Sequence, residues 1–348
     1  MTQDPFSNLR DDIIKSNTID NEVYQRFEVK RGLRNQDGSG VLAGLTRISS
    51  VVGAQVVDYK SEPVEGILSY RGISLADLVA ESKDQSPFCF EKCVFLLLVG
   101  RLPDQDELTL ISKEIGKQRI LPESIVEHTI KAIPSPNIMN KLQTVVSSLY
   151  IVDDNPESLD PYDNFLKAVN LTAKFPIITA YGYLAAVKEN PTFVEPSPDM
   201  STAEAFLTVL HEGKKPTDLE VNVLDLALLL HAEHGGGNNS SFTTHVVTSS
   251  GTDIYSSVVA ALASLKGPLH GNANKKVMEM LGDIKTHVSD WSNREAVKTY
   301  LEAILSGKAF DKSGKIYGLG HAVYTKSDPR AVIIKELAKE IADKSDRM

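Results

Sequence analysis

Two histidines, an acid and three glycines lie together in the segment HAEHGGGNNSS, residues 231–241. Imidazole and carboxylate groups can bind a metal ion, and glycines at a helix end let the backbone approach a phosphate or an anionic substrate. The spacing of His231, Glu233 and His234 is not that of H-E-x-x-H, and the glycines follow a predicted helix rather than a strand, without the Lys-Ser/Thr of phosphate-binding loops. Alone, the segment therefore favours a plain junction between two helices.

A second histidine lies in the segment GPLHGNAN, residues 267–274. Gly267 and Pro268 predict the end of one helix, and Asn272 or Asn274 predicts the start of the next. The N-terminus of a helix is electropositive, so His270 just ahead of it is expected to stay neutral. A neutral histidine can donate an N–H to a carbonyl oxygen that gains charge, although a histidine in a turn is also consistent with this motif.

A third histidine follows the glycines of KIYGLGHAVYTKSDPRAV, residues 315–332. Asp328 and Pro329 predict the start of a helix, with Arg330 in its first turn. A cation is unfavourable at that end of a helix, so an anion bound to Arg330 would explain its position. The alternative is a surface arginine that pairs with Asp328.

The elements that must position these loops are mostly helices. Strand-forming residues are confined to about 45–72, which predicts a small antiparallel ribbon. Pro176 lies inside a long helical pattern, which predicts a kink or two abutting helices. A capping box at Thr217–Glu220 begins the apolar helix that leads to His231. The other predicted helices cover about 86–100, which ends at Gly100, 104–118, 123–133, 137–152, 201–212, 240–250 and 252–266.

Composition limits the possible functions. The chain has 348 residues and a net charge of −9, with 42% hydrophobic and 24% charged residues. That charge argues against a nucleic-acid partner, and no apolar run is long enough to span a membrane. No secretory or organelle-targeting signal is visible, so we expect a cytoplasmic protein. Cys89 and Cys93 lie in an apolar helix and are predicted to be core residues rather than a disulfide or a metal site.

Taken in order, the three histidine loops resemble the citrate synthase family. HAEHGGGN resembles its H-[AS]-D-H-E-x-N segment, GPLHGNAN its G-P-x-H-G-x-A-N segment, and GHAVYTKSDPRA its G-H-x-V-x-x-x-D-P-R segment. The segments GVLAGLTRISSVVG, ILSYRGI and FLLLVGRLP are also similar to family segments. The resemblance therefore covers most of the chain from about residue 30.

The resemblance implies a two-domain, mostly helical acyltransferase, with a large domain at 1–270 and a small domain at 271–348. It is expected to be a homodimer that condenses acetyl-CoA with oxaloacetate by enolisation, addition and thioester hydrolysis, without a cofactor or a metal. His270 and His321 would be catalytic, one at the thioester carbonyl and the other at the ketone of oxaloacetate. Oxaloacetate would be held by His234, Arg330 and Asn238, and CoA by Ile316, Tyr317, Gly318, Leu319 and Gly320.

The sequence departs from the family pattern at two places. Gly235 stands where the family often has glutamate. Nothing after Arg330 resembles the V-D-F-Y-S-G segment that carries the family's proton-abstracting aspartate, and Asp343 and Asp346 lie on the predicted helix that follows Arg330. Two further substrate-binding arginines are also not found. The expectation is a chain that lacks the C-terminal part of its small domain and is inactive by itself, without turnover at a useful rate.

Three other functions remain open. A 2-methylcitrate synthase that uses propionyl-CoA differs by one methylene in the acyl pocket. A non-catalytic homologue that acts as a binding subunit would explain the missing aspartate, although it would not need His234, His270, His321 and Arg330 together. A metallohydrolase that uses His231, Glu233 and His234 is the least favoured.

Overall fold

The computed structural model describes residues 21–26, 46–57, 60–82, 88–267, 270–271, 273–321 and 323–345. The chain divides into two compact units, Met1–Gly44 and Leu45–Met348. In the first unit the described residues form helix α2, Asn21–Arg26. All predicted site residues belong to the second unit.

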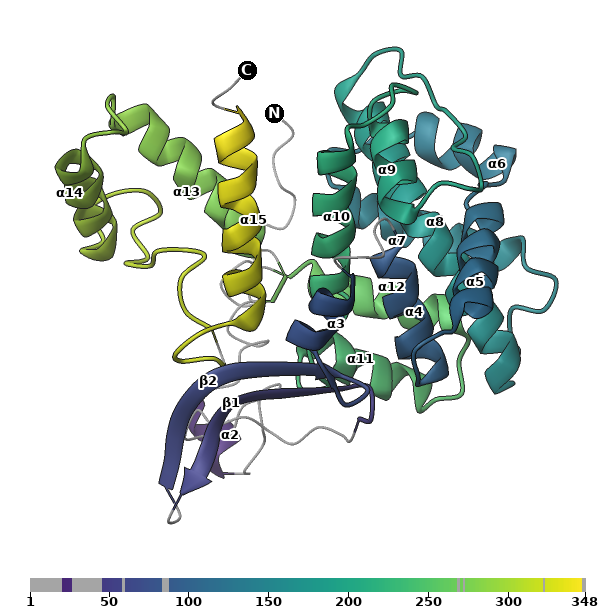
Figure 1. The fold of residues 1–348 in the computed structure, drawn as a ribbon, viewed down its shortest axis with the longest axis horizontal. Coiled ribbons are helices and arrows are strands. Elements are labelled where there is room, and N and C mark those ends of the chain that lie inside the picture. The colour runs from purple at the N-terminus through teal and green to yellow at the C-terminus, as the bar shows by residue number, and fades with distance from the viewer. Residues whose placement is uncertain are drawn as a thin grey trace, which may run out of the picture. The chain divides into compact units, whose positions relative to one another are not determined.

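The second unit is mostly helical, as predicted, with one small sheet near its beginning (Figure 1). Its described helices are α3 (Leu75–Ser82), α4 (Cys89–Val99), α5 (Gln105–Gln118), α6 (Glu123–Ile125) with a π-helical continuation at Val126–Lys131, α7 (Ile138–Ile151), α8 (Pro161–Val187), α9 (Thr202–Leu210), α10 (Asp218–Leu230), α11 (Asn239–Thr248), α12 (Ile254–Leu265), α13 (Ala273–His287), α14 (Arg294–Leu305) and α15 (Pro329–Ser345).

The sheet confirms the predicted ribbon. Strands β1 (Ser49–Val57), β2 (Lys60–Tyr70) and β3 (Ile73–Ser74) pair antiparallel in that order. The register between β1 and β2 shifts between Val52 and Ala54, which places an irregularity at Gly53. Residue 45 and the connection at 58–59 lie outside the described residues.

Several helix boundaries follow the sequence signals. Helix α4 is followed by Gly100 at φ 95°, a left-handed conformation that glycine adopts without strain. Helix α10 begins with the capping box of Thr217 and Glu220. Asn272, one of the two residues expected to begin α13, lies outside the described residues.

Two abutting helices, one of the two outcomes predicted at Pro176, are not found. Helix α8 runs through Pro176 as one continuous helix of 27 residues, and no second helix begins there. Proline inside a helix costs about 3 kcal/mol, chiefly through a lost hydrogen bond and a clash. Its neighbours Ile177 and Ile178 are fully buried, and their burial contributes roughly 1.5–3 kcal/mol each, which offsets that cost.

Helices α4 and α10 are joined by a buried carboxylate. Asp225 of α10 accepts hydrogen bonds from the backbone N–H groups of Cys89, at 2.8 Å, and Phe90, at 3.1 Å. It therefore satisfies donors at the start of α4, where Phe88 offers no side-chain cap. Burial is the main cause that raises the pKa of Asp225 to about 7. This contact fixes the helix that leads directly into the first histidine loop.

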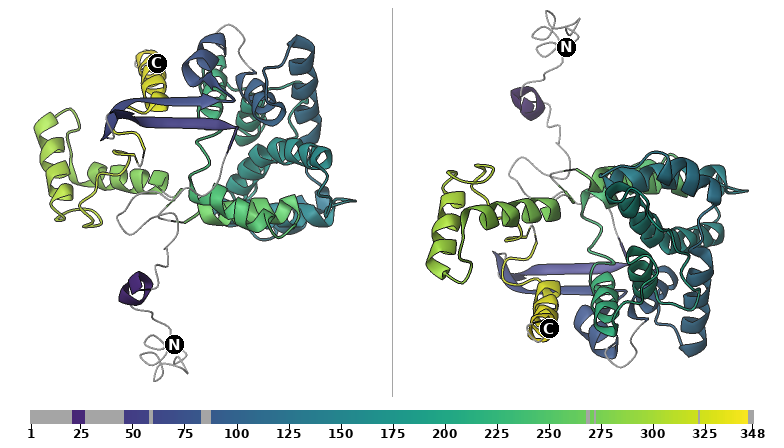
Figure 2. Two further views of the ribbon diagram at one scale, coloured as in Figure 1. Left: turned by 90° about the horizontal axis from the view of Figure 1, so that it is seen from below. Right: turned by 90° about the horizontal axis from the view of Figure 1, so that it is seen from above.

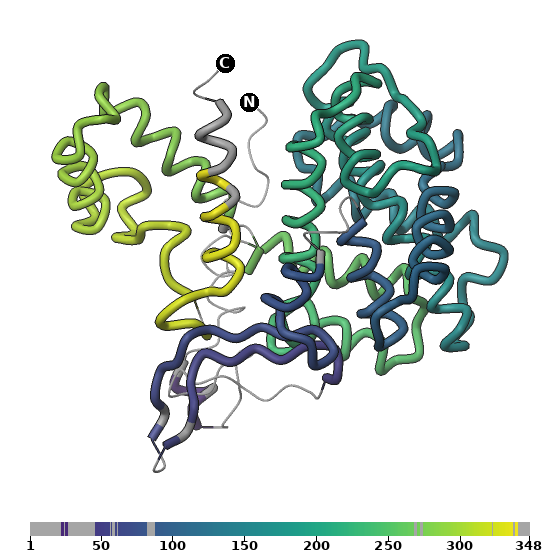
Figure 3. The backbone as a smooth tube through the Cα atoms, in the orientation of Figure 1, coloured from purple at the N-terminus to yellow at the C-terminus, as the bar shows by residue number. Residues whose placement is uncertain are grey.

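The segment 323–328 lies directly on the β1–β2 hairpin. A Cβ atom at Gly53 would come within 2.2 Å of the carbonyl oxygen of Val323, and one at Gly66 within 2.2 Å of that of Ser327. The Gly66 N–H donates to the Ser327 hydroxyl oxygen at 3.3 Å, and that hydroxyl donates to Glu65. Only glycine leaves room for this approach, and helix α15, which follows, packs against β2, α3 and α10 (Figures 1 and 3).

Buried apolar side chains form separate clusters. One joins α7, α8, α9 and α12, and another joins the hairpin to α3, α4 and α10. A third is centred on Met280, Ile284, Val288 and Ile304 of the α13–α14 region. Figure 2 shows the α13–α14 region, in green, set off from the larger group of helices. This cluster lies within 271–348, and the predicted domain boundary at residue 270 remains a prediction.

Two further features bear on the sequence predictions. Cys89 and Cys93 are buried thiols that are not joined in a disulfide, as predicted for core residues. In the part of the chain that the structure describes, no helix combines the length and apolar character needed to cross a bilayer.

The close approach at the hairpin predicts the effect of one added methyl group. Gly66→Ala should lower the free energy of unfolding by about 1–3 kcal/mol, because its Cβ would overlap the Ser327 backbone. The measurement is urea denaturation followed by circular dichroism. The matched control is Gly282→Ala in α13, where a Cβ meets nothing and the change should be neutral or stabilise by about 0.5–1 kcal/mol. Equal stability of the two variants would show that the hairpin does not require glycine at residue 66.

Candidate active site

The first histidine loop begins where α10 ends. The His231 ring contacts its own helix, with Nδ1 at 2.7 Å from the Ala227 carbonyl oxygen. Glu233 accepts hydrogen bonds from the Gly235 N–H at 2.6 Å and the Ser49 hydroxyl at 2.9 Å. Gly235 has φ 82°, and a Cβ there would meet Val51 at 2.9 Å. His231 and Glu233 thus hold the loop to its helix and to the hairpin.

Asn238 closes the same loop. Its side-chain oxygen accepts the Ser241 N–H at 2.9 Å and so caps α11, and its amide nitrogen donates to the Gly235 carbonyl at 2.8 Å. The predicted contact of Asn238 with oxaloacetate remains a prediction.

His234 and His321 come together from loops 87 residues apart in the sequence. Their ring centroids are 5.0 Å apart with an interplanar angle of 72°. Tyr324 contacts both: its ring stacks on His321 at 4.8 Å and meets His234 edge-on at 5.5 Å. The sequence analysis did not single out Tyr324. The Nε2 atom of His234 is buried and has no hydrogen-bond partner in the described structure.

Arg330 faces this pair as part of an ion pair with Asp328. Its Nε donates to one carboxylate oxygen at 3.0 Å and its Nη2 to the other at 2.6 Å. The sequence analysis left this pairing open as an alternative, but the side chains are only 17% and 20% exposed, so it is not a surface pair. After desolvation, the positive charge of Arg330 is a further cause that lowers the pKa of His234 and of His321.

Both histidines are kept neutral. Burial is the main cause that lowers the pKa of His234 to about 4, followed by the charge of Arg330. The pKa of His321 is also lowered, first by desolvation, although the residue as a whole is exposed.

The backbone selects the tautomer of His321. Its Nδ1 accepts the N–H groups of Val323, at 3.0 Å, and Tyr324, at 3.1 Å. In the neutral ring the proton must therefore lie on Nε2, which makes Nε2–H a hydrogen-bond donor.

His270 lies at the approach to α13, as predicted, and contacts α11. Its Nε2 is 2.9 Å from the Ser240 hydroxyl oxygen, which is also 3.1 Å from the Ala261 carbonyl. Burial lowers the pKa of His270, so the neutral ring expected from the helix terminus is favoured by desolvation. The hydroxyl has one proton, which it can donate either to the Ala261 carbonyl oxygen or to Nε2, and only donation to Nε2 leaves Nδ1–H as the outward donor of the neutral ring. Sequence reasoning missed Ser240, whose proximity to His270 depends on how α11 and α12 pack.

The predicted CoA-binding segment lies against the start of the same helix. A Cβ at Gly318 would come within 3.1 Å of Val277 in α13. Tyr317 donates its hydroxyl to Asp311 at 2.7 Å, and Ile316 packs on the α13–α14 cluster. Leu319 is 77% exposed between Gly318 and Gly320, both in the left-handed region of φ. The segment is therefore accessible and held close to the helix that follows His270.

The site also contains a possible set of metal ligands. His234, His321 and Asp328 each offer a ligand atom, and these atoms lie within 4.8 Å of one another. A histidine that binds a metal usually donates its other ring N–H to an acceptor. The Nδ1 of His321 instead faces two backbone donors, so a metal on Nε2 would force a proton toward those N–H groups. The residues fit a hydrogen-bond donor site better than a metal site.

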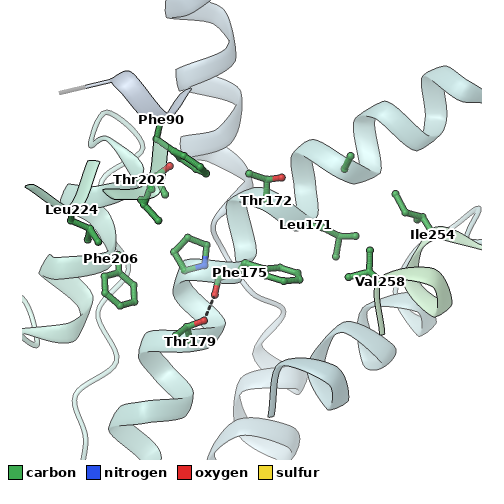
Figure 4. Close-up of a pocket in the computed structure, with 13 residues that line it drawn as sticks. Phe90, Leu171, Thr172, Phe175, Thr179, Thr202, Phe206, Leu224, Ile254 and Val258 are labelled. Atoms are coloured by element: carbon green, nitrogen blue, oxygen red, sulfur yellow. Dashed lines mark hydrogen bonds between the residues drawn. The ribbon is translucent and has the colours of Figure 1, made fainter. Parts of the chain in front are cut away.

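A large apolar hollow lies elsewhere. It has a volume of about 540 Å³ and lies among α4, α8, α9, α10 and α12 (Figure 4). The residues that line it are Phe90, Ala168, Leu171, Thr172, Phe175, Pro176, Thr179, Thr202, Phe206, Leu224, Leu228, Ile254 and Val258. None of them is charged or a predicted site residue, so the hollow offers no acid–base chemistry.

The described residues thus form a mostly helical fold in which two neutral histidines and an arginine lie at helix breaks. The family model described as "Citrate synthase, C-terminal domain" matches residues 36–348, and the chain belongs to the citrate synthase family. It is 34% identical over 306 residues to "Citrate synthase 2" of Bacillus subtilis, and that alignment covers 87% of this chain and 73% of that protein.

Two further similarities bear on substrates. "Citrate/2-methylcitrate synthase" of Bacillus subtilis is 33% identical over 308 residues, covering 88% of this chain and 74% of that protein. A citrate synthase structure from Thermoplasma acidophilum, in a ternary complex with carboxymethyl coenzyme A and oxaloacetate, aligns with a TM-score of 0.69 and 25% identity. That alignment covers 87% of this chain and 72% of the other.

The low pKa of His234 predicts how acid affects stability. In the unfolded chain His234 takes up a proton below about pH 6.5, whereas the folded protein resists it down to about pH 4. Protons therefore favour unfolding across that interval, and stability should fall as pH falls through it. Between pH 6.5 and pH 4.5 the free energy of unfolding should fall in both proteins, but the fall should be smaller in His234→Gln by at least about 1 kcal/mol. The measurement is urea denaturation at each pH.

The control is His287→Gln, which changes an exposed histidine of α13. The raised pKa of Asp225 acts in the opposite direction, but it is present in every variant and cancels from the difference. Parallel stability curves for the His234 and His287 variants would contradict a buried, neutral His234.

Proposed function

We propose that this chain condenses an acyl-CoA, chiefly acetyl-CoA, with oxaloacetate to form citrate and CoA. The observation that carries the proposal is the pairing of neutral His234 and His321 with Arg330 at one point, where backbone N–H groups make His321 Nε2–H a donor. The proposal is also supported by the family of the chain.

Oxaloacetate is the substrate proposed for this pair. It carries two carboxylates and a ketone, and addition to the ketone places negative charge on its oxygen. His321 would donate Nε2–H to that oxygen, and a fixed donor stabilises developing charge without reorganising. Arg330 has five N–H groups and Asp328 accepts two of its side-chain ones, so three remain for a substrate carboxylate. His234 Nε2, buried and unpartnered, offers a further contact.

His270 is the residue proposed to act on the acyl-CoA. Removing a proton from the acyl methyl group places negative charge on the thioester oxygen. A neutral imidazole can donate an N–H hydrogen bond to that oxygen and so stabilise the charge. The exposed 316–320 segment near α13 would meet CoA through its backbone. Desolvation lowers the pKa of His270, and we assign no proton-abstracting base.

The acyl group is the main alternative within this proposal. Propionyl-CoA, which would give 2-methylcitrate, is a second candidate because one similar protein is named for both activities. One methylene changes selectivity by only about 10–200-fold. Comparing acetyl-CoA with propionyl-CoA at equal concentration separates the two.

The proposal has three further parts, which concern cofactors, oligomeric state and location. The reaction needs no cofactor or metal, because the donors described above supply the charge stabilisation. The chain forms a homodimer, which the exposed apolar side chains where α7 ends and α8 begins support: Ile151, Leu159 and Tyr162 are 79%, 57% and 66% exposed. A cytoplasmic location is the third part, and it rests on the sequence, in which no targeting signal is visible.

Arg330→Ala should weaken oxaloacetate binding by at least about tenfold, because a charge-assisted contact to a carboxylate is lost. Isothermal titration of the 348-residue chain gives the dissociation constant directly. The matched control is Arg101→Ala, which removes another arginine paired with a carboxylate, Glu107, outside the site. Oxaloacetate affinity that is the same in both variants would remove Arg330 from the binding site.

Release of CoA thiol tests the reaction itself. We expect release only when oxaloacetate is present, at a rate about 10²–10⁴-fold below ordinary enzyme turnover, because no segment of the sequence resembles the one that carries the family's proton-abstracting aspartate. His270→Ala should lower that rate by a further factor of about one hundred, and His287→Ala should leave it unchanged. Chelators should have no effect. Oxaloacetate-independent release would contradict the proposal, and ordinary turnover would show that the base lies within these 348 residues.

A further inference from the structure

Tyr324 occupies a position between the two histidines of the site. Its side chain is nearly buried, with the residue only 4% exposed. The ring lies almost parallel to that of His321, at an interplanar angle of 26°, and almost perpendicular to that of His234, at 85°. One aromatic ring therefore contacts a face of one imidazole and the edge of the other.

The hairpin holds Tyr324 from the opposite side. A Cβ at Gly66 would lie 2.7 Å from the ring atom Cδ1, and one at Gly53 would lie 3.2 Å from Cα. The Tyr324 backbone N–H also donates to His321 Nδ1. The hydroxyl reaches the Ile67 carbonyl only at 3.5 Å, which is a weak contact. The position of the ring is thus fixed by packing, and the hydroxyl contributes little.

We propose that Tyr324 is a positioning residue whose ring fixes the planes of His234 and His321 and excludes water from between them. The effect of Tyr324 on the reaction rests on the proposed function, whereas its packing against the two histidines does not depend on that function. A stacked ring restricts rotation of the imidazole, so that Nε2–H keeps one direction relative to a bound ketone. An aromatic pair of this kind contributes about 0.5–1.5 kcal/mol beyond the area that it buries.

The electrostatics of the pair support this role. The charged groups that act on both imidazoles are Asp328 and Arg330, and His321 also acts on His234. Desolvation is nevertheless the largest cause of the lowered pKa at both histidines. The pKa of Tyr324 is raised to about 12, chiefly by burial, so its ring covers the histidines without adding a charge. The ring therefore favours neutral imidazoles by excluding water.

Two substitutions separate the ring from the hydroxyl. Tyr324→Leu keeps an apolar side chain but removes the ring, and we expect it to raise the pKa of His234 by about one unit or more as water enters. Tyr324→Phe keeps the ring and should leave the pKa values of both histidines within about 0.3 units of those in the unchanged protein. The measurement is the pH titration of the histidine C2–H signals by nuclear magnetic resonance, assigned with His234→Gln and His321→Gln.

The matched control is Tyr181→Leu. Tyr181 is equally buried, at 4% exposed, and stacks on Phe193 in a different cluster. Its loss should cost comparable stability and leave the pKa of His234 and His321 unchanged. If Tyr324→Leu behaves as Tyr181→Leu does, or if Tyr324→Phe fails to restore the titration, Tyr324 is an ordinary core residue and the proposal is wrong.

Oxaloacetate titration of the same variants distinguishes this inference from the proposed function. Tyr324→Leu should weaken oxaloacetate binding at least about fivefold, and Tyr324→Phe should not, since misdirected donors lose part of their hydrogen-bond energy. If the unchanged protein binds no oxaloacetate while Tyr324→Leu still shifts the histidine pKa, the positioning role stands and the proposed function fails. If oxaloacetate binds equally to all variants and the pKa values do not move, the positioning role fails alone.

Discussion

The site depends on two places where backbone meets backbone. Gly53 and Gly66 let residues 323–328 lie on the β1–β2 hairpin at a distance that no side chain permits. This contact fixes the backbone around Tyr324, and that backbone supplies the N–H groups that set the tautomer of His321. The same hairpin receives the other histidine loop, since Glu233 bonds to Ser49 and Gly235 lies against Val51. A small sheet thus aligns two loops that belong to distant helices.

The charges of the site follow from its burial. The chain carries a net charge of −9, so an anionic substrate meets an unfavourable average field. Arg330 gives a local positive charge, but burying it alone would be costly, and Asp328 offsets that cost. The histidines beside it could not both be charged as well. Desolvation and the charge of Arg330 keep them neutral, which is the state in which an imidazole donates without repelling the arginine.

The sequence signals that succeeded are local ones. Gly100, the Thr217–Glu220 box and Asp328-Pro329 act through their own backbone conformation, so they predicted helix ends. The identity of the site came from the order of three histidine loops in one chain. Ser240 and Tyr324 could not be found in this way, because each acts through packing between segments distant in sequence. Of the two outcomes predicted at Pro176, two abutting helices are not found, because burial of the neighbouring residues outweighs a local rule, and a kink there stays a prediction.

The unpartnered Nε2 of His234 indicates why the site is built so rigidly. A buried polar atom without a partner costs about 1–3 kcal/mol, and proteins tolerate this cost where a ligand removes it. The surrounding contacts prevent the loop from relaxing to satisfy that nitrogen locally, since Asn238, Glu233 and Tyr324 all hold it in place. On the proposed function, an oxaloacetate oxygen that reached Nε2 would remove this cost, and a ligand without such a group would not. The unmet hydrogen bond would then favour oxaloacetate over such a ligand.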